Sequence, residues 1–198
     1  MKATRKEHDF LGELEIPNEV YYGVQTFRAI ENFNITGIPI SKEPLFIKAL
    51  GYVKKAAAMA NKDCGVLDAK IAEAICYGSD QLIAGKFDQE FVSDLIQGGA
   101  GTSVNMNANE VIANIGLEYL GHKKGEYQYL HPNNHVNCSQ STNDAYPSAF
   151  RIALYLKMES FLTTLEELEK AFPLFQRPWI QSLIVRWQSQ WHVKVGWA

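Results

Sequence analysis

Hydrophobic residues recur with the period of an α-helix from about residue 44 onward. In the stretch 44–64 the apolar residues are three or four positions apart, which places them on one face of a helix. They are Phe46, Leu50, Val53, Ala57 and Ala60. Gly65 follows, and glycine often stands just after a helix end. The pattern therefore predicts a helix from Pro44 to about Gly65.

Three further helices are predicted along the rest of the chain. Asp68 suits the capping position of the second, which ends near Gly85, because its carboxylate can accept from free first-turn amides. The third spans about 104–120, and the fourth begins near Pro147, since proline is favoured in a first turn. Residues 9–40 contain proline and glycine breakers, so short strands or turns are expected there. The predicted fold class is mainly α, with long helices that bundle.

The composition is that of an ordinary globular protein. Of the 198 residues 46% are hydrophobic and 21% charged, with a net charge of −3, whereas a disordered chain has few apolar residues and a large net charge. This charge argues against nucleic-acid binding through bulk positive charge. No stretch has the ~18 apolar residues of a membrane span, and residues 1–9 lack the apolar core of a secretory signal. Three widely spaced cysteines without a CxxC pair fit a reducing compartment, so a cytoplasmic location is expected.

The first group of chemistry-bearing residues opens the predicted third helix. It reads Gln-Gly-Gly-Ala-Gly-Thr-Ser-Val-Asn-Met-Asn over 97–107. The glycines allow close approach of the backbone to a ligand, and the first amides of a helix are free donors at the positive end of its dipole. Thr102 and Ser103 add hydroxyls at the capping position. The stretch is thus either an anion site or a flexible glycine loop with ordinary caps, and it lacks the lysine of a Walker loop.

The second group, residues 131–144, is almost entirely polar and ends in Ser-Thr-Asn-Asp ahead of the fourth helix. These side chains offer hydroxyl and amide groups at a second helix N-terminus. Asn143 can both donate and accept, which suits an ammonium or a hydroxyl. A capping cluster after a loop explains the residues equally well. His131 and His135 lack a third ligand and a rigid frame, so no metal is expected.

Three separated strings, in this order, resemble the aspartase/fumarase superfamily. They are Tyr-Tyr-Gly-Val-Gln-Thr with Arg-Ala-Ile-Glu-Asn-Phe within 21–33, Gly-Gly-Ala-Gly-Thr-Ser-Val-Asn-Met-Asn at 98–107, and Gln-Ser-Thr-Asn-Asp at 140–144. The likeness runs from about Asp9 to Phe172. The chain is more similar to the aspartase family than to class II fumarases, which usually have Gln-Ser after Thr102 and Ser-Ser-Asn in place of Ser-Thr-Asn. The string Lys-Gly-Glu-Tyr-Gln-Tyr-Leu at 124–130 also looks like aspartase.

The resemblance implies an N-terminal lyase domain at 1–138, with short strands near its start, followed by the first long helix of a central helical bundle at 139–172. The implied activity is a carbon–nitrogen lyase reaction, the reversible deamination of L-aspartate to fumarate and ammonia without an organic cofactor. The implied partners are a small dicarboxylate and, for a full-length member, other copies of the chain in a homotetramer. No nucleic acid and no membrane are expected as partners.

The resemblance also assigns substrate-binding residues. Thr102, Ser141 and Thr142 would hydrogen-bond the β-carboxylate, whose two oxygens become negative in the intermediate and need donors fixed in advance. Asn143 would orient the amino group. The residues of the supporting loop are Gly101, Ser103 and Asn105. A second, non-catalytic dicarboxylate site of fumarases is matched by His131, Asn133 and Asn134, although the family pattern has Asp where this chain has Asn134.

The resemblance stops where the composition changes. All four Trp lie in the last 20 residues, and no Asp or Glu follows Glu169. The segment 173–198 is therefore expected to be an aberrant tail, produced by a frameshift or premature stop near codon 172. The family's base, a serine in a downstream Gly-Ser-Ser loop, has no counterpart, so the catalytic residue is unassigned and the chain is expected to be a truncated, inactive fragment. The alternatives are a class II fumarase fragment and a non-catalytic helical interaction protein.

Overall fold

The computed structural model describes residues 3–97 and 99–171, and most of them are helical. A hairpin of β1 (Thr4–Asp9) and β2 (Gly12–Pro17) opens the chain. The longer helices are α1 (Val24–Asn32), α2 (Pro44–Asp63), α3 (Ala69–Ile83), α4 (Thr102–Tyr119) and α5 (Thr142–Ala171). The short turns are η1 (Ile40–Lys42), η2 (Asp88–Glu90), η3 (Gly99–Gly101) and η4 (Pro132–Val136). The predicted fold class, mainly α with short strands near the start, is confirmed.

The chain divides into two compact units, Met1–Tyr155 and Leu156–Ala198. The described part of the second unit is the remainder of α5, residues 156–171. The domain boundaries predicted after residues 138 and 172 stay predictions. The predicted aberrant tail, 173–198, lies outside the described residues.

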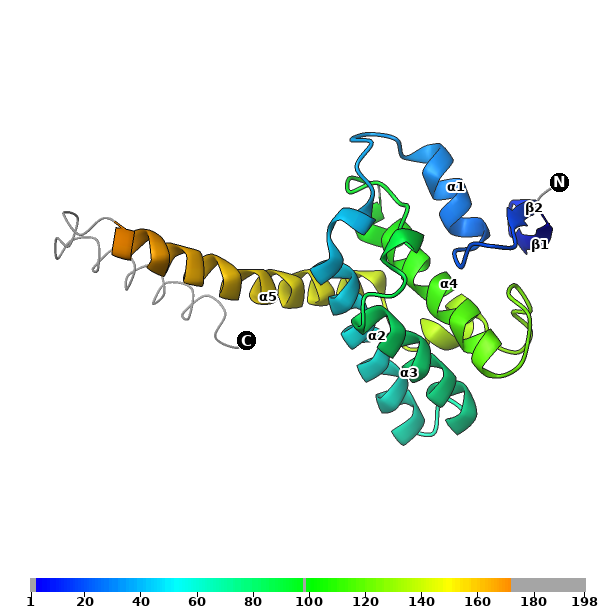
Figure 1. Ribbon diagram of the computed structural model, residues 1–198. Helices are drawn as coiled ribbons and strands as arrows, with labels where there is room; N and C mark the ends of the chain where they lie inside the picture. The colour runs from blue at the N-terminus through cyan, green and yellow to red at the C-terminus, as the bar shows by residue number, and fades with distance from the viewer. Residues whose placement is uncertain (1–2, 98, 172–198) are drawn as a thin grey trace. The chain divides into compact units, whose positions relative to one another are not determined.

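Helix α4 is the central element of the first unit, and α3 packs between it and α2 (Figure 1). Every residue of α4 from Val104 to Leu117 is buried. At Gly78 of α3 the two backbones approach closely, since a Cβ there would come within 2.9 Å of the Ile112 carbonyl oxygen. Burial on all sides explains why α4 tolerates polar residues only where they find partners inside the protein.

Two expectations about helix position are corrected. The buried face of α2 includes Lys54 and Asn61, whereas Ala60 is exposed, so the apolar face is rotated by about one residue from the predicted one. Helix α5 begins at Thr142, and Pro147 lies inside it rather than at its start. Proline there removes the amide that would otherwise donate to the carbonyl four residues earlier, because only the first four amides of a helix lack helical partners.

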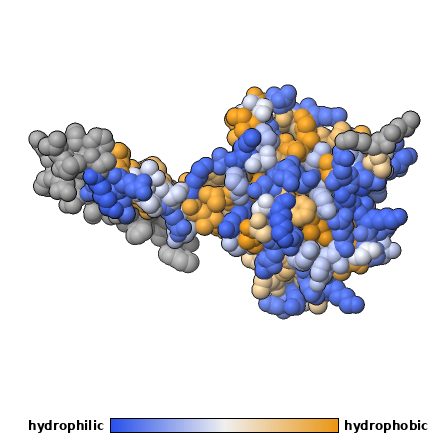
Figure 2. All heavy atoms as spheres, viewed as in Figure 1, coloured by the Kyte–Doolittle hydropathy of each residue, from blue (hydrophilic) through white to orange (hydrophobic). Residues whose placement is uncertain are grey.

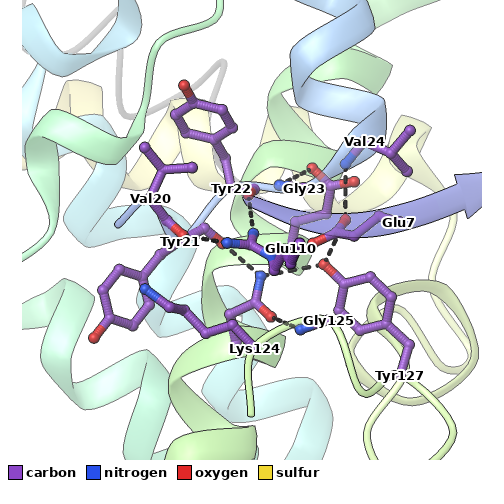
Figure 3. A network of polar contacts seen from close by, with 12 residues as sticks. Glu7, Val20, Tyr21, Tyr22, Gly23, Val24, Glu110, Lys124, Gly125 and Tyr127 are labelled. Carbon is purple, nitrogen blue, oxygen red and sulfur yellow. Dashed lines mark hydrogen bonds and ion pairs between the residues drawn. The ribbon is translucent and has the colours of Figure 1, made fainter. Parts of the chain in front are cut away.

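A buried carboxylate of α4 holds α1 in place, and a second one, from the N-terminal hairpin, joins that hairpin to α1 (Figure 3). Glu110 of α4 accepts hydrogen bonds from the backbone nitrogens of Gly23 (2.9 Å), Gln25 (2.9 Å) and Thr26 (3.1 Å), and from Thr26 Oγ1 (2.6 Å). Next to it, Glu7 accepts from Val24 N at 2.9 Å. The two carboxylates satisfy free amides at the start of α1, which Gly23 cannot cap. Burial raises the pKa of Glu110 to about 7.

No helix within residues 3–97 and 99–171 is long and apolar enough to cross a membrane. On the face of the first unit drawn in Figure 2, hydrophilic surface is interrupted by separate hydrophobic patches.

Candidate active site

The loop before α4 has an unusual backbone. Gly99, Ala100 and Gly101 have φ angles of 70°, 51° and 92°, all in the left-handed region. Glycine adopts this region freely, but Ala100 is strained there by roughly 1–2 kcal/mol. Such strain persists only where the surroundings impose it, and it is concentrated at functional sites. Gly98 lies outside the described residues.

The cap of α4 differs from the predicted one. Thr102 and Ser103 were expected to cap the helix with their hydroxyls. Instead Gln97 reaches across the loop, and its Oε1 accepts from Val104 N at 2.9 Å. The exposed Thr102 hydroxyl donates to the carbonyl of Gly99 at 2.6 Å. The Thr102 hydroxyl therefore closes the glycine loop on itself, and Gln97 provides the cap.

Ser141 caps the second helix N-terminus. Its Oγ accepts from Asn143 N at 3.2 Å, and its carbonyl accepts from Asp144 N and Ala145 N. Thr142 and Asn143 consequently lie in the first turn of α5, where backbone amides and the helix dipole favour an anion. Ser141 and Asn143 are exposed and Thr142 is half-buried.

The two polar strings meet in the fold. Asn105 Nδ2 of α4 donates to Thr142 Oγ1 at 3.2 Å and to Asn137 Oδ1 at 3.0 Å. The glycine loop also touches α5, because a Cβ at Gly101 would overlap the Tyr146 ring. Segments about 40 residues apart along the chain thus share one location.

A pocket of about 460 Å³ opens at this junction. It is lined by Leu95, Ile96, Gln97, Ala100, Gly101, Asn143, Tyr146 and Pro147. Of the predicted site residues, Gly101 and Asn143 line it; Thr102, Ser141 and Thr142 flank it in sequence without belonging to its lining. Amide and hydroxyl groups beside two helix N-termini provide donors suited to a small anion. Among the described residues no three His, Cys, Asp or Glu side chains are grouped as a metal ion needs.

The predicted second site lies in and before η4. His131 Nδ1 accepts from the backbone nitrogens of Asn133 (3.0 Å) and Asn134 (3.2 Å), so this imidazole caps the turn. Burial, with a contribution from His135, lowers the pKa of His131. The Asn133 and Asn134 residues are exposed. Dicarboxylate binding at this position stays a prediction.

Residues that the sequence patterns did not single out complete the junction. Lys54 of α2 is fully buried and donates to Asn137 Oδ1 at 3.0 Å and Gln140 Oε1 at 2.9 Å. Burial lowers the pKa of Lys54 to about 7. A signal existed, because Lys54 lies four residues after Leu50 and so on the buried face of the helix.

Comparison with known proteins identifies the family. A family model described as Lyase matches residues 12–174. The chain belongs to this lyase family. An aspartate ammonia-lyase from Helicobacter pylori strain J99 is 57% identical over 168 residues, which are 85% of this chain and 36% of that protein. The chain therefore spans about a third of the length of the curated relatives it matches.

Solved structures agree with the family. A crystal structure titled as a fumarate lyase:delta crystallin from Brucella melitensis is 50% identical, with a TM-score of 0.84, over 86% of this lyase chain and 40% of that chain. A class II fumarase from Schistosoma mansoni is 34% identical, with a TM-score of 0.71, over 76% of this chain and 32% of that chain. The higher identity to the aspartate ammonia-lyase confirms the resemblance to the aspartase branch.

Proposed function

We propose that the chain is the N-terminal part of an aspartate ammonia-lyase and supplies the loops that hold the β-carboxylate and amino group of L-aspartate. The contact between Asn105 and Thr142 carries the proposal, because it joins the two strings that the resemblance assigns to one substrate. The 57% identity to an aspartate ammonia-lyase favours aspartate over malate as the substrate. A class II fumarase, at 34% identity, is the second candidate.

In the proposed reaction a base removes a proton from Cβ of L-aspartate. The electron pair is held on the β-carboxylate, which becomes doubly negative, and the C–N bond then breaks to leave fumarate and ammonia. Thr102, Ser141 and Thr142 donate to that carboxylate, and the dipoles of α4 and α5 favour its charge. The Thr102 hydroxyl must turn from the Gly99 carbonyl to do so. No organic cofactor takes part.

The base is proposed to come from another part of the full-length enzyme, because no Gly-Ser-Ser string occurs in the 198 residues. A full-length member is proposed to act as a homotetramer. We therefore expect no turnover by this chain alone, and measurable fumarate production by the purified chain would contradict that expectation.

Fragment complementation tests the function. The chain is mixed with the remainder of the Helicobacter pylori relative, and fumarate formation from L-aspartate and from L-malate is followed by ultraviolet absorbance. We expect the mixture to turn over L-aspartate, whereas neither part does so by itself. Asn143→Ala is expected to lower the turnover rate about 10²-fold or more, as when a positioned donor is removed. Turnover of L-malate instead would identify a fumarase.

A non-catalytic interaction role has one observation in its favour. Large apolar side chains of α5 are exposed, namely Phe150, Tyr155, Phe161 and Leu168. Exposed apolar side chains of this kind are typical of an interface or of an aggregation-prone fragment. Size-exclusion chromatography separates the two, since a discrete complex indicates an interaction protein and polydisperse aggregate indicates a fragment lacking its bundle.

A further inference from the structure

The buried ammonium of Lys54 connects three elements of the first unit. Its Nζ donates to Asn137 Oδ1 at 3.0 Å and to Gln140 Oε1 at 2.9 Å. Both acceptors stand in the segment between η4 and α5, directly before Ser141 and Thr142. The neighbouring Lys55 is different, because it pairs at the surface with Asp80 of α3 at 2.7 Å.

Helix α4 contributes to the same cluster. Asn105 Nδ2 and Asn109 Nδ2 donate to Asn137 Oδ1 at 3.0 Å and 3.3 Å, so this one oxygen accepts from Lys54 and from both asparagines. Asn105 also donates to Thr142 Oγ1. The cluster of Lys54, Asn105, Asn109, Asn137 and Gln140 is therefore a continuous connection from α2 through α4 to the first residue of α5.

Stability alone does not favour this arrangement. Burying an ammonium requires its desolvation, and apolar residues of similar volume often stabilise a core at least as well. The Oδ1 atoms of Asn105 and Asn109 are buried and have no hydrogen-bond partner among the described residues, which is a further cost. The cluster instead fixes the orientation of the segment before α5, because hydrogen bonds are directional.

We propose that Lys54 is a positioning residue, which fixes the turn at Ser141–Asn143 relative to α4 by holding Asn137 and Gln140. The inference rests on the proposed function, in which that turn holds the substrate carboxylate. Positioning matters there, because donors stabilise a developing charge only if they are oriented before the charge appears. Lys54 itself contacts no substrate in this account.

Hydrogen exchange of the 198-residue chain, measured without substrate, tests the proposal. The reporter amides are those of Gln140, Asp144 and Ala145, which donate to the Asn137 and Ser141 carbonyls of the segment that Lys54 holds. Lys54→Met is expected to lower their protection about ten-fold or more, while Lys55→Met leaves it unchanged. Amides in the middle of α4 report whether each variant is folded. Unchanged reporter protection in a folded Lys54→Met overturns the proposal.

A pH series tests whether opening of this segment exposes the Lys54 ammonium. The two side chains that accept hydrogen bonds from Lys54, those of Asn137 and Gln140, are uncharged carboxamides, and Asp80 of α3 is engaged by Lys55. Burial lowers the pKa of Lys54 to about 7, so raising the pH from 6 to 9 removes its charge. We expect reporter protection, corrected for intrinsic exchange, to rise in the wild type, because opening of the segment exposes Lys54 and the open state binds the extra proton, and to stay constant in Lys54→Met. A wild-type protection that is independent of pH would contradict the contact between Lys54 and this segment.

Gln140→Met provides a second variant at a half-buried, more tolerant position. It should release the same reporter amides, and the double variant with Lys54→Met should release them by less than the sum of the two single effects, because both changes break the bond between Lys54 and Gln140. Fully additive effects would overturn the proposal. Exchange is measured without substrate, so an unchanged reporter protection would overturn the role of Lys54 without affecting the proposed function. Absence of L-aspartate turnover in the complemented enzyme would overturn the proposed function without affecting the role of Lys54.

Discussion

Replacing Gly101 by alanine tests the contact between the glycine loop and α5. The change has two costs. Gly101 has φ +92°, where a Cβ costs roughly 1–2 kcal/mol. The added methyl would also overlap the Tyr146 ring, and overpacking of this kind costs roughly 1–3 kcal/mol. Together they predict that Gly101→Ala lowers the free energy of unfolding by about 2–5 kcal/mol.

Gly121→Ala is the matched control. Gly121 has φ +84°, but a Cβ there meets nothing within 4 Å. The control should therefore lose only the backbone contribution, roughly 1–2 kcal/mol. Urea unfolding followed by circular dichroism measures both variants. Equal losses in Gly101→Ala and Gly121→Ala would show that the glycine loop does not pack on Tyr146 of α5.

Three further predictions concern stability against pH. The pKa of Glu110 is about 7 in the folded chain against an ordinary value of 4.5, so the folded state binds the extra proton and the free energy of unfolding falls as pH rises from 4.5 to 7. Glu110→Gln should abolish that fall, of up to about 1.4 kcal/mol per pH unit. The pKa of Lys54 is about 7 in the folded chain against an ordinary value of 10.5, so the unfolded state binds the extra proton and the free energy of unfolding rises between pH 7 and 10.5. Lys54→Met should remove this rise, and Lys55→Met should keep it. Burial acts to raise the pKa of Asp94, but hydrogen bonds including those from Thr36 lower it to about 2. The folded state is therefore destabilised as pH falls from 3.8 to 2, and Asp94→Asn should lose this acid dependence. Denaturant unfolding across each pH range measures all three dependences. If the slope of the unfolding free energy against pH remains after a residue is replaced, that residue is not its source.

Local signals were sufficient for the helices that carry their own caps and stops. Asp68 was expected to cap a helix, and its Oδ1 accepts from Lys70 N at 2.8 Å at the start of α3. The third helix was expected to end near residue 120, and α4 ends at Tyr119, two residues before Gly121. In these cases the residues that determine the boundary are next to it in sequence.

Boundaries set by distant residues could not be predicted in this way. Helix α1 was missed because Gly23 gives no cap and the carboxylate that satisfies its first amides comes from Glu110, more than 80 residues away. Helix α5 was placed too late because Pro147 is a typical first-turn residue, whereas Ser141 is the actual cap.

In the candidate site, too, the sequence indicates the residues involved but not the distant contacts between them. The resemblance selected the two polar strings, but neither their spacing nor their composition shows that Asn105 bonds to Thr142. The partners of Lys54, Asn137 and Gln140, lie more than 80 residues from it. Only the packing of α2 and α4 brings that cluster together.

Binding of one dicarboxylate by both strings can be observed in a titration of the ¹⁵N-labelled chain with fumarate, followed by NMR. We predict that the backbone amides of Gly101–Ser103 and of Thr142 and Asn143 shift together and fit one dissociation constant, while Gly121 stays still. A response confined to one string, or two different dissociation constants, would contradict the shared site.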